Sequence, residues 1–180
     1  GHGSRMSGAT KNGIQEKDIN LDIVLQLKAL FDAYDGNIGV YYTRTDDSNP
    51  TLQQRAELAN KAGADLFISV HNNSSGTGNF TSVNGTQVLY SESDDRELGS
   101  KKLAQICLDN VTAATGSNDF GLLKADDIYI VRSSEAPVAL IEVGFMTNRD
   151  ELAKLADPEY QKTAAQGIFN AVLEAVKEGY

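Results

Sequence analysis

Two histidines and two glutamates occupy positions where their side chains could carry out chemistry. His71 closes an apolar run over residues 65–71, and Glu142 closes another over residues 137–142. In open α/β sheets, ligands bind beyond the carboxyl ends of strands. We therefore expect His71 and Glu142 at such an edge. Position alone also fits a strand-end histidine bonded to a loop carbonyl and a glutamate in a structural ion pair.

His2 and Glu16 lie near the amino end of the chain. Taken alone, His2 is most simply a vector-derived or flexible terminal residue, and Glu16 in the first turn of a predicted helix complements the helix dipole. Taken as a set, two imidazoles and two carboxylates with no cysteine cluster suit Zn²⁺. A catalytic zinc site uses three protein ligands and leaves one position for water, so the fourth group would act as a base.

The elements that must position these residues alternate between helical and extended patterns. The predicted helices cover residues 16–34, 52–62 and 96–115, with a last one beginning near Pro158. In the first of them, apolar residues recur at spacings of three and four, as on a helix that packs against a core. The second has Thr51 as its cap and Gly63 at its end.

The predicted strands cover residues 39–43, 65–71, 85–90, 128–131 and 138–142. The run over 65–71 is apolar on both faces, which is typical of a parallel or central strand. Residues 72–84 form a polar loop that fits either a lid over a substrate groove or a plain solvent loop. This alternation predicts the α/β class: a single three-layer domain with a mainly parallel central sheet flanked by helices, and a site at the carboxyl ends of the strands.

Composition narrows the possible functions. The chain has 180 residues, of which 41% are hydrophobic, and this is enough for the core of one domain. Its 16 basic and 25 acidic residues give a net charge of −9, which argues against nucleic acid or an anionic membrane surface as the main partner. No apolar run reaches the 18 or so residues of a membrane span. The single cysteine, Cys107, excludes an internal disulfide, and its place on an apolar helix stripe predicts a buried thiol.

Several short motifs together resemble a known family. In chain order they are Gly1-His2-Gly3, residues 16–21 (EKDINL), residues 42–44 (YTR), Leu52 with Arg55, Ala59 and Asn60, residues 64–73 (ADLFISVHNN) and residues 142–148 (EVGFMTN). The chain thus resembles the zinc-dependent N-acetylmuramoyl-L-alanine amidases of bacterial cell-wall hydrolysis, of the sporulation and autolytic kind. The resemblance covers essentially all of the chain, and each motif is weak alone but specific in combination.

The resemblance implies a function and a set of roles. His2, Glu16 and His71 would be the zinc ligands and Glu142 the catalytic carboxylate; the fourteen-residue step from His2 to Glu16 matches the family and favours His2 as a ligand. The substrate would be peptidoglycan or its muropeptides, cut at the amide between N-acetylmuramic acid and L-alanine. The resemblance also implies extracytoplasmic action. Because the acidic charge offers no attraction to an anionic wall, we expect a wall-binding module elsewhere, and the absence of a long apolar run predicts no insertion into a membrane.

The resemblance bears on the start of the chain as well. The chain begins without an initiator methionine, a signal peptide or a strand. We therefore expect residues 1–180 to form one catalytic domain that lacks the family's first strand, which normally precedes the Gly-His-Gly motif.

Other positions match the family or depart from it. Arg44, Arg55 and Asn60 resemble the family's framework positions, and for both arginines ion pairing with nearby carboxylates is the simpler interpretation. Phe120 stands before Gly121 where the family usually carries an arginine, so details of substrate contact differ. Three aromatic residues near the predicted strands are expected mainly in the core: Tyr90, Tyr129 and Phe80.

Two alternatives remain open at the level of the sequence. A zinc exopeptidase that cuts within the stem peptide would need a cation for the substrate's free carboxyl end, and Arg132 is the evident candidate. A catalytically silent wall-binding domain would need a broken ligand set, whereas all four key positions are filled.

Overall fold

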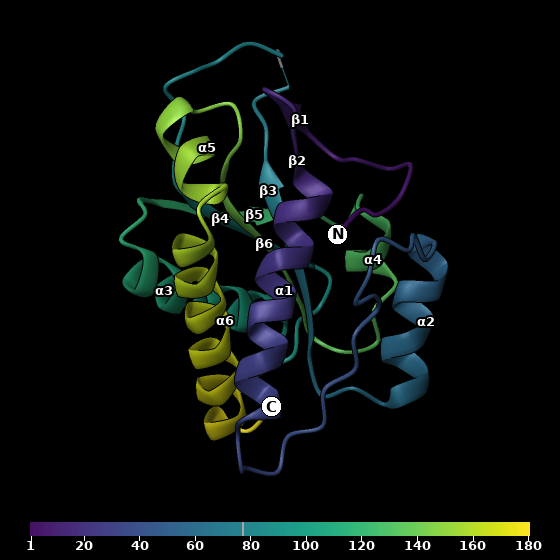
Figure 1. Ribbon diagram of the computed structural model, residues 1–180. Helices are drawn as coiled ribbons and strands as arrows, with labels where there is room; N and C mark the ends of the chain where they lie inside the picture. Colours follow the sequence, from purple (N-terminus) through teal and green to yellow (C-terminus); the bar gives the residue numbers. More distant parts are fainter. Residues whose placement is uncertain (77) are drawn as a thin grey trace.

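The computed structural model describes residues 1–76 and 78–180, which fold around a four-stranded sheet in the order β3–β6–β4–β5 (Figure 1). These strands are β3 (Phe67–Asn73), β4 (Thr86–Tyr90), β5 (Asp119–Lys124) and β6 (Val138–Phe145). β3 runs parallel to β6, and β4 runs parallel to β5, while β4 and β6 are antiparallel. The predicted α/β class with a mainly parallel sheet is confirmed, and one antiparallel pair lies at its centre.

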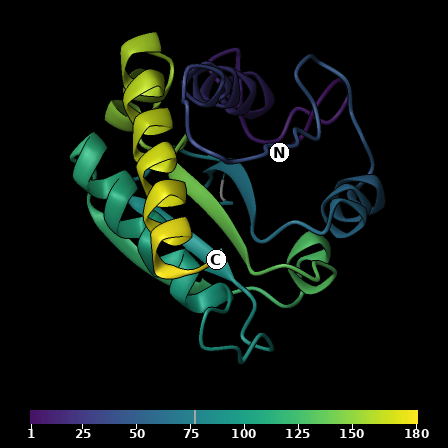
Figure 2. The ribbon, with the colours of Figure 1, turned by 90° about the horizontal axis from the view of Figure 1, so that it is seen from below.

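Helices cover both faces of the sheet (Figure 2). The helices are α1 (Glu16–Asp32), α2 (Leu52–Ala62), α3 (Ser100–Thr115), α4 (Tyr129–Arg132), α5 (Arg149–Leu155) and α6 (Pro158–Glu178). α1, α3 and α6 pack on one face, and α2 and α4 lie on the other, which gives the three predicted layers. A short hairpin of β1 (Thr10–Lys11) and β2 (Ile14–Gln15) leads directly into α1.

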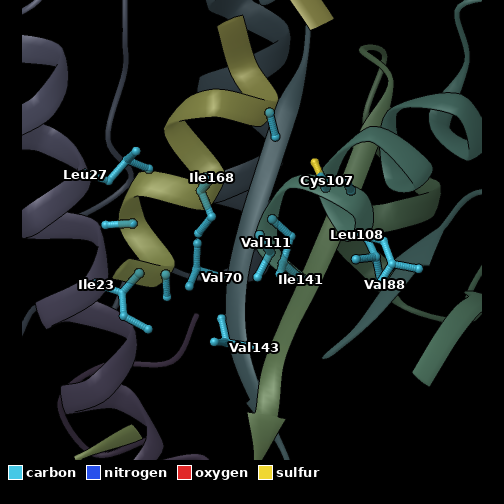
Figure 3. Packing of buried hydrophobic residues seen from close by; sticks show 14 of the residues in the cluster. Ile23, Leu27, Val70, Val88, Cys107, Leu108, Val111, Ile141, Val143 and Ile168 are labelled. Carbon is cyan, nitrogen blue, oxygen red and sulfur yellow. The ribbon is translucent and has the colours of Figure 1, made fainter. Parts of the chain in front are cut away.

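β6 explains why there are two apolar clusters. Alternate side chains of a strand point to opposite faces of the sheet. Ile141 and Val143 therefore join the main core beneath α1, α3 and α6 (Figure 3), whereas Leu140 joins a smaller core with α4. Cys107 is fully buried in the main core, as expected, and burial raises the pKa of its thiol to about 12.

Local sequence fixes the ends of two helices as predicted. Thr51 and Gln54 form a reciprocal capping box at the start of α2, and Gly63 ends that helix in the left-handed conformation with φ of 60°. Asp157 caps α6 by accepting the N–H of Glu159. α3 begins at Ser100, four residues later than predicted, because the carboxylate of Asp94 accepts the N–H of Ser100 and supplies the cap from outside the helix.

Other assignments from sequence were wrong or incomplete. Residues 128–131 were predicted as a strand but form the start of α4, where the carbonyl of Ile128 accepts the N–H groups of Val131 and Arg132. The run is only four residues long, and its buried side chains pack on the smaller core from a helical turn. Residues 39–43, also predicted as a strand, pair with no strand among residues 1–76 and 78–180.

The predicted loop over residues 72–84 begins later than expected, because β3 continues through Asn73. Thr77 within that prediction lies outside the described residues. Sequence analysis missed β5, which is short, largely exposed and paired only with β4. It also missed α5, whose N-cap Asn148 accepts the N–H groups of Asp150 and Glu151.

A cavity of about 540 Å³ follows the edge of β3 that faces away from β6. Its walls come from α1, α2, residues 37–44 and residues 64–70. In the described part of the chain, β3 has β6 as its only partner strand. None of the described helices combines the length and the apolar character that crossing a membrane requires.

Candidate metal centre and catalytic site

β3 and β6 place two of the predicted residues side by side. His71 and Glu142 are register partners on these parallel strands, so their side chains leave the same face of the sheet as neighbours. Both lie near the carboxyl ends of their strands. This confirms the expected edge, although each strand continues two or three residues beyond the position at which sequence analysis ended it.

Glu16 lies between the two imidazoles. Its Oε2 is 3.1 Å from Nε2 of His2, and its Oε1 is 2.9 Å from Nδ1 of His71. The two imidazole ring centroids are 5.0 Å apart. One donor atom from each of the three residues lies within 4.8 Å of the other two. Two nitrogens and a carboxylate oxygen at this spacing can hold a metal ion.

Two asparagines that sequence analysis did not assign help to hold the Glu16 carboxylate. Asn20, one helical turn after Glu16, donates its Nδ2 to Oε1 at 3.2 Å, and the backbone N–H of Asn72 donates to the same oxygen at 3.2 Å. Asn72 also donates to Asn20. The four-residue spacing from Glu16 to Asn20 was a usable signal, because residues i and i+4 share one face of a helix.

The loop that carries His2 is held by the two framework arginines. Arg55 donates to the carbonyl of His2 at 2.8 Å, and Arg44 donates to the carbonyls of Gly1 and Lys17. The expected ion pairs are not what the described residues show, since both guanidinium groups bind mainly backbone carbonyls. The arginines therefore act on the site by fixing the backbone next to His2.

Gly8 completes this packing. It adopts a φ of +67°, which favours glycine. A Cβ at Gly8 would also overlap Oε2 of Glu16 and Cδ2 of His2. The backbone N–H of the following residue, Ala9, donates to Oε2 of Glu16 at 2.9 Å. Close approach of this backbone to the carboxylate therefore depends on the missing side chain.

The surroundings set the charge of two of the three donors. Burial by itself would raise the pKa of Glu16, but hydrogen bonds from His2 and His71 outweigh it and hold that pKa well below its usual range. Burial lowers the pKa of His71 to about 4, and the neighbouring amino terminus acts in the same direction. At neutral pH, Glu16 is therefore an anion and His71 is a neutral imidazole, which are the forms that ligate metals.

Glu142 is placed differently from the three donors. Its Oε2 is buried and has no hydrogen-bond partner in the described part of the chain. Burial, followed by the charge of Glu16, raises the pKa of Glu142 to about 8. The ion pair that sequence analysis left open is not found among the described residues. A carboxyl of this kind can exchange a proton near neutral pH.

The remaining candidates have other surroundings. Arg132 donates to the carbonyl of Asp127 and lies over the ring of Tyr129, so its partners belong to its own segment. Asn60 donates to the carbonyl of Ser133 and ties α2 to the segment after α4. Phe120, on β5, packs edge-on against Phe145 with ring centroids 5.0 Å apart.

The fold of this chain is similar to the folds of two solved amidase structures. A crystal structure of N-acetylmuramoyl-L-alanine amidase from Clostridium difficile 630 matches with a TM-score of 0.91 and 32% identity, over 100% of this chain and 95% of that one. The catalytic domain of CwlV, N-acetylmuramoyl-L-alanine amidase from Bacillus (Paenibacillus) polymyxa var. colistinus, matches with a TM-score of 0.89 and 32% identity, over 98% and 94% of the two chains.

Sequence relatives lead to the same family. N-acetylmuramoyl-L-alanine amidase LytC of Bacillus subtilis is 34% identical over 96% of this chain, which spans only 34% of the length of LytC. The family model described as N-acetylmuramoyl-L-alanine amidase matches residues 1–174. Since that match runs through every element that carries the donor cluster and Glu142, the chain belongs to the N-acetylmuramoyl-L-alanine amidase family.

Proposed function

We propose that this protein is a zinc-dependent amidase that hydrolyses the bond between N-acetylmuramic acid and the L-alanine of the peptidoglycan stem peptide. One observation carries the proposal: in a chain of this family, a donor cluster of His2, Glu16 and His71 lies next to Glu142, whose buried Oε2 has no hydrogen-bond partner among the described residues. Because peptidoglycan lies outside the cytoplasmic membrane, the proposed place of action is extracytoplasmic.

The donor set suits zinc as the resident metal. Two imidazoles and one carboxylate form a common ligand set of catalytic zinc, which leaves the fourth position open. Hydrogen bonds from Asn20, Asn72 and Ala9 hold the Glu16 carboxylate, as the partners of a metal-ligating carboxylate usually do. His2, Glu16 and His71 would hold the ion, and Glu142 would remain outside the ligand set.

The mechanism assigns proton transfer to Glu142. When bound, zinc supplies Lewis acidity, which polarises a carbonyl and lowers the pKa of water towards about 7. Glu142 accepts a proton from the attacking water at its Oε2 and delivers that proton to the leaving amine of L-alanine. Transfer in both directions requires a carboxyl that can reach the water and the leaving amine, and in the metal-free protein burial raises the pKa of Glu142.

A digest of purified peptidoglycan, analysed by mass spectrometry, tests the reaction. With zinc present, we expect intact stem peptides that carry a new free amine on L-alanine. Glu142→Gln should abolish turnover and keep zinc bound, while Glu135→Gln, at an exposed carboxyl, should leave both unchanged. Retained turnover in Glu142→Gln would remove Glu142 from its role.

The two alternatives make different products. Stem peptides that are shortened from within would favour the zinc exopeptidase, although Arg132 has its partners within its own segment. A wall-binding domain without catalysis would bind peptidoglycan and release nothing. The filled donor set supports catalysis over that alternative.

A further inference from the structure

Two cationic side chains share one aromatic ring near the candidate site. Nζ of Lys11 lies 4.8 Å from the centroid of the Phe80 ring, and the guanidinium carbon of Arg149 lies 4.0 Å from the same centroid. Phe80 is half-buried and packs against the main core, so the ring is a fixed platform. We call these three residues the Lys11–Phe80–Arg149 cluster.

The cluster comes from the three segments that adjoin the candidate site. Lys11 lies in the hairpin that leads into Glu16, and Phe80 lies in the segment that follows His71 and β3. Arg149 begins α5, directly after the strand that carries Glu142. The N–H of Thr81 donates to the carbonyl of Thr147 at 2.8 Å and ties two of these segments together. Figure 1 shows the hairpin, the segment after β3 and α5 at the end of the sheet towards which β3 points.

Neither cation is neutralised by a carboxylate. Among the described residues, Lys11 donates to the carbonyl of Gly78, and the guanidinium of Arg149 takes part in no hydrogen bond or ion pair. The chain as a whole carries a net charge of −9, so two unneutralised cations on one ring run against its overall charge. A guanidinium binds a carboxylate through two parallel hydrogen bonds, and an ammonium adds a point charge beside it.

We propose that the Lys11–Phe80–Arg149 cluster binds a carboxylate of the substrate's stem peptide. The inference rests on the proposed amidase function and extends it to specificity: the site prefers an acidic stem peptide over one whose carboxyl is a carboxamide. The Phe80 ring holds both cations in place. The anion accepts hydrogen bonds from those N–H groups of Lys11 and Arg149 that have no acceptor among the described residues. A carboxamide has no net charge and also presents N–H groups to these donors, so it binds less tightly.

Binding can be measured without turnover in the zinc-loaded Glu142→Gln protein. The probes are a muramyl dipeptide that ends in glutamate and its bis-carboxamide, in which both the α- and the γ-carboxyl are amidated, each titrated by calorimetry. We expect the acidic probe to bind about tenfold more tightly, the scale of one charge-assisted hydrogen bond. Arg149→Met and Lys11→Met should each reduce this preference, and the double variant should abolish it.

Lys154→Met is the matched control, because it removes the same charge from an exposed position of the same helix, α5. It should keep the preference. Equal binding of the two probes by the parent protein would overturn the inference, as would an equal loss in the control.

The outcomes separate the two proposals. Hydrolysis of peptidoglycan without a preference for the acidic probe would refute the carboxylate site alone. A preference that depends on Arg149 and Lys11, in a protein that releases no amidase product, would uphold the carboxylate site and refute the proposed function. In the active protein, the cluster variants should raise KM for the acidic substrate and leave kcat unchanged.

Discussion

At the scale of single residues, the Glu16 carboxylate is the centre of the site. Both of its oxygens are occupied: Oε2 faces His2 and the N–H of Ala9, while Oε1 faces His71, Asn20 and the N–H of Asn72. Such a fully bonded carboxylate has one orientation available. The position of a bound metal would therefore be set by the hydrogen bonds that hold the Glu16 carboxylate.

Gly8 offers a sharp test of this packing. We expect Gly8→Ala to weaken zinc binding by about 10–100-fold, the usual effect of disturbing groups that orient metal ligands, because the new Cβ overlaps Glu16 and His2. Gly13→Ala is the matched control: Gly13 has a similar φ of +81°, but nothing lies within 4 Å of its Cβ position. Competition with a chromogenic chelator measures the zinc affinity of both variants. An equal loss of zinc affinity in the two variants would mean that backbone strain, and not the overlap with Glu16 and His2, weakens binding.

The raised pKa of Glu142 predicts how the metal-free protein responds to pH. Between the unfolded value of 4.5 and the folded value of about 8, the folded state holds a proton that the unfolded state has lost, so stability falls as pH rises through this window. Glu142→Gln stays neutral and avoids that loss. In EDTA at pH 8.5, we expect it to be more stable than the parent by an amount on the order of 5 kcal/mol, since one unit of pKa corresponds to about 1.4 kcal/mol.

Thermal unfolding from pH 4 to pH 9 measures this difference. Its signature is a gap in Tm between the two proteins that widens with pH and closes below pH 4.5. A gap that does not depend on pH would contradict the raised pKa.

At the scale of elements, the sequence predicted those helices and strands whose limits are determined by residues at their own ends. α2 matched from cap to cap because Thr51, Gln54 and Gly63 fix both of its ends within the helix itself. Glu16, His71 and Glu142 were located because each follows or opens a clearly patterned element. Two segments were predicted as strands and are not: one forms the turn of α4, and the other, residues 39–43, pairs with no strand among the described residues. β-branched and aromatic residues alone do not make a segment a strand, because pairing with a neighbouring strand and packing against the core also determine its conformation.

The sequence also did not predict hydrogen bonds that join segments far apart in the chain. At the site, Asn72 reaches Asn20 across 52 positions of sequence; away from the site, the Glu151 carboxylate accepts the N–H groups of Gly85 and Phe145. Such bonds depend on how α1, β3 and α5 are placed in space. No spacing along the chain encodes that placement.

The cavity beside β3 leads to a prediction about a strand joined to the amino end of Gly1. A strand running parallel to β3 would fill this apolar space and use the open edge of β3. The amine of Gly1 already donates to the carbonyl of Val70 at 2.6 Å, as a backbone N–H in such a strand would. Residues 39–43, which have a strand-like composition and no partner strand among the described residues, also line this cavity.

We therefore expect that six β-branched, apolar residues joined to Gly1 raise the Tm, since they bury apolar surface and add ladder hydrogen bonds. Six glycine and serine residues at the same place are the matched control and should leave the Tm nearly unchanged. Differential scanning calorimetry compares the three chains. The same Tm for both extended chains would show that the cavity does not accept a strand.

At the scale of the whole molecule, charge works against the proposed substrate. A net charge of −9 repels an anionic cell wall, and the Lys11–Phe80–Arg149 cluster supplies only local attraction. The chain also spans about a third of the length of LytC. From this charge we predict a division of labour, in which this domain would cut the wall and a separate module would hold it.

The sign of the salt dependence tests that division. If repulsion limits binding, retention of the zinc-loaded Glu142→Gln protein on purified walls should increase when salt rises from 0.05 M to 0.5 M, because the screening length falls from above 10 Å to below 8 Å. Walls stripped of anionic polymers should retain more protein and show little salt dependence. Fusion to a wall-binding module should raise retention at every salt concentration. Retention that instead falls with salt would mean that attraction by local cations dominates, and that the domain finds the wall unaided.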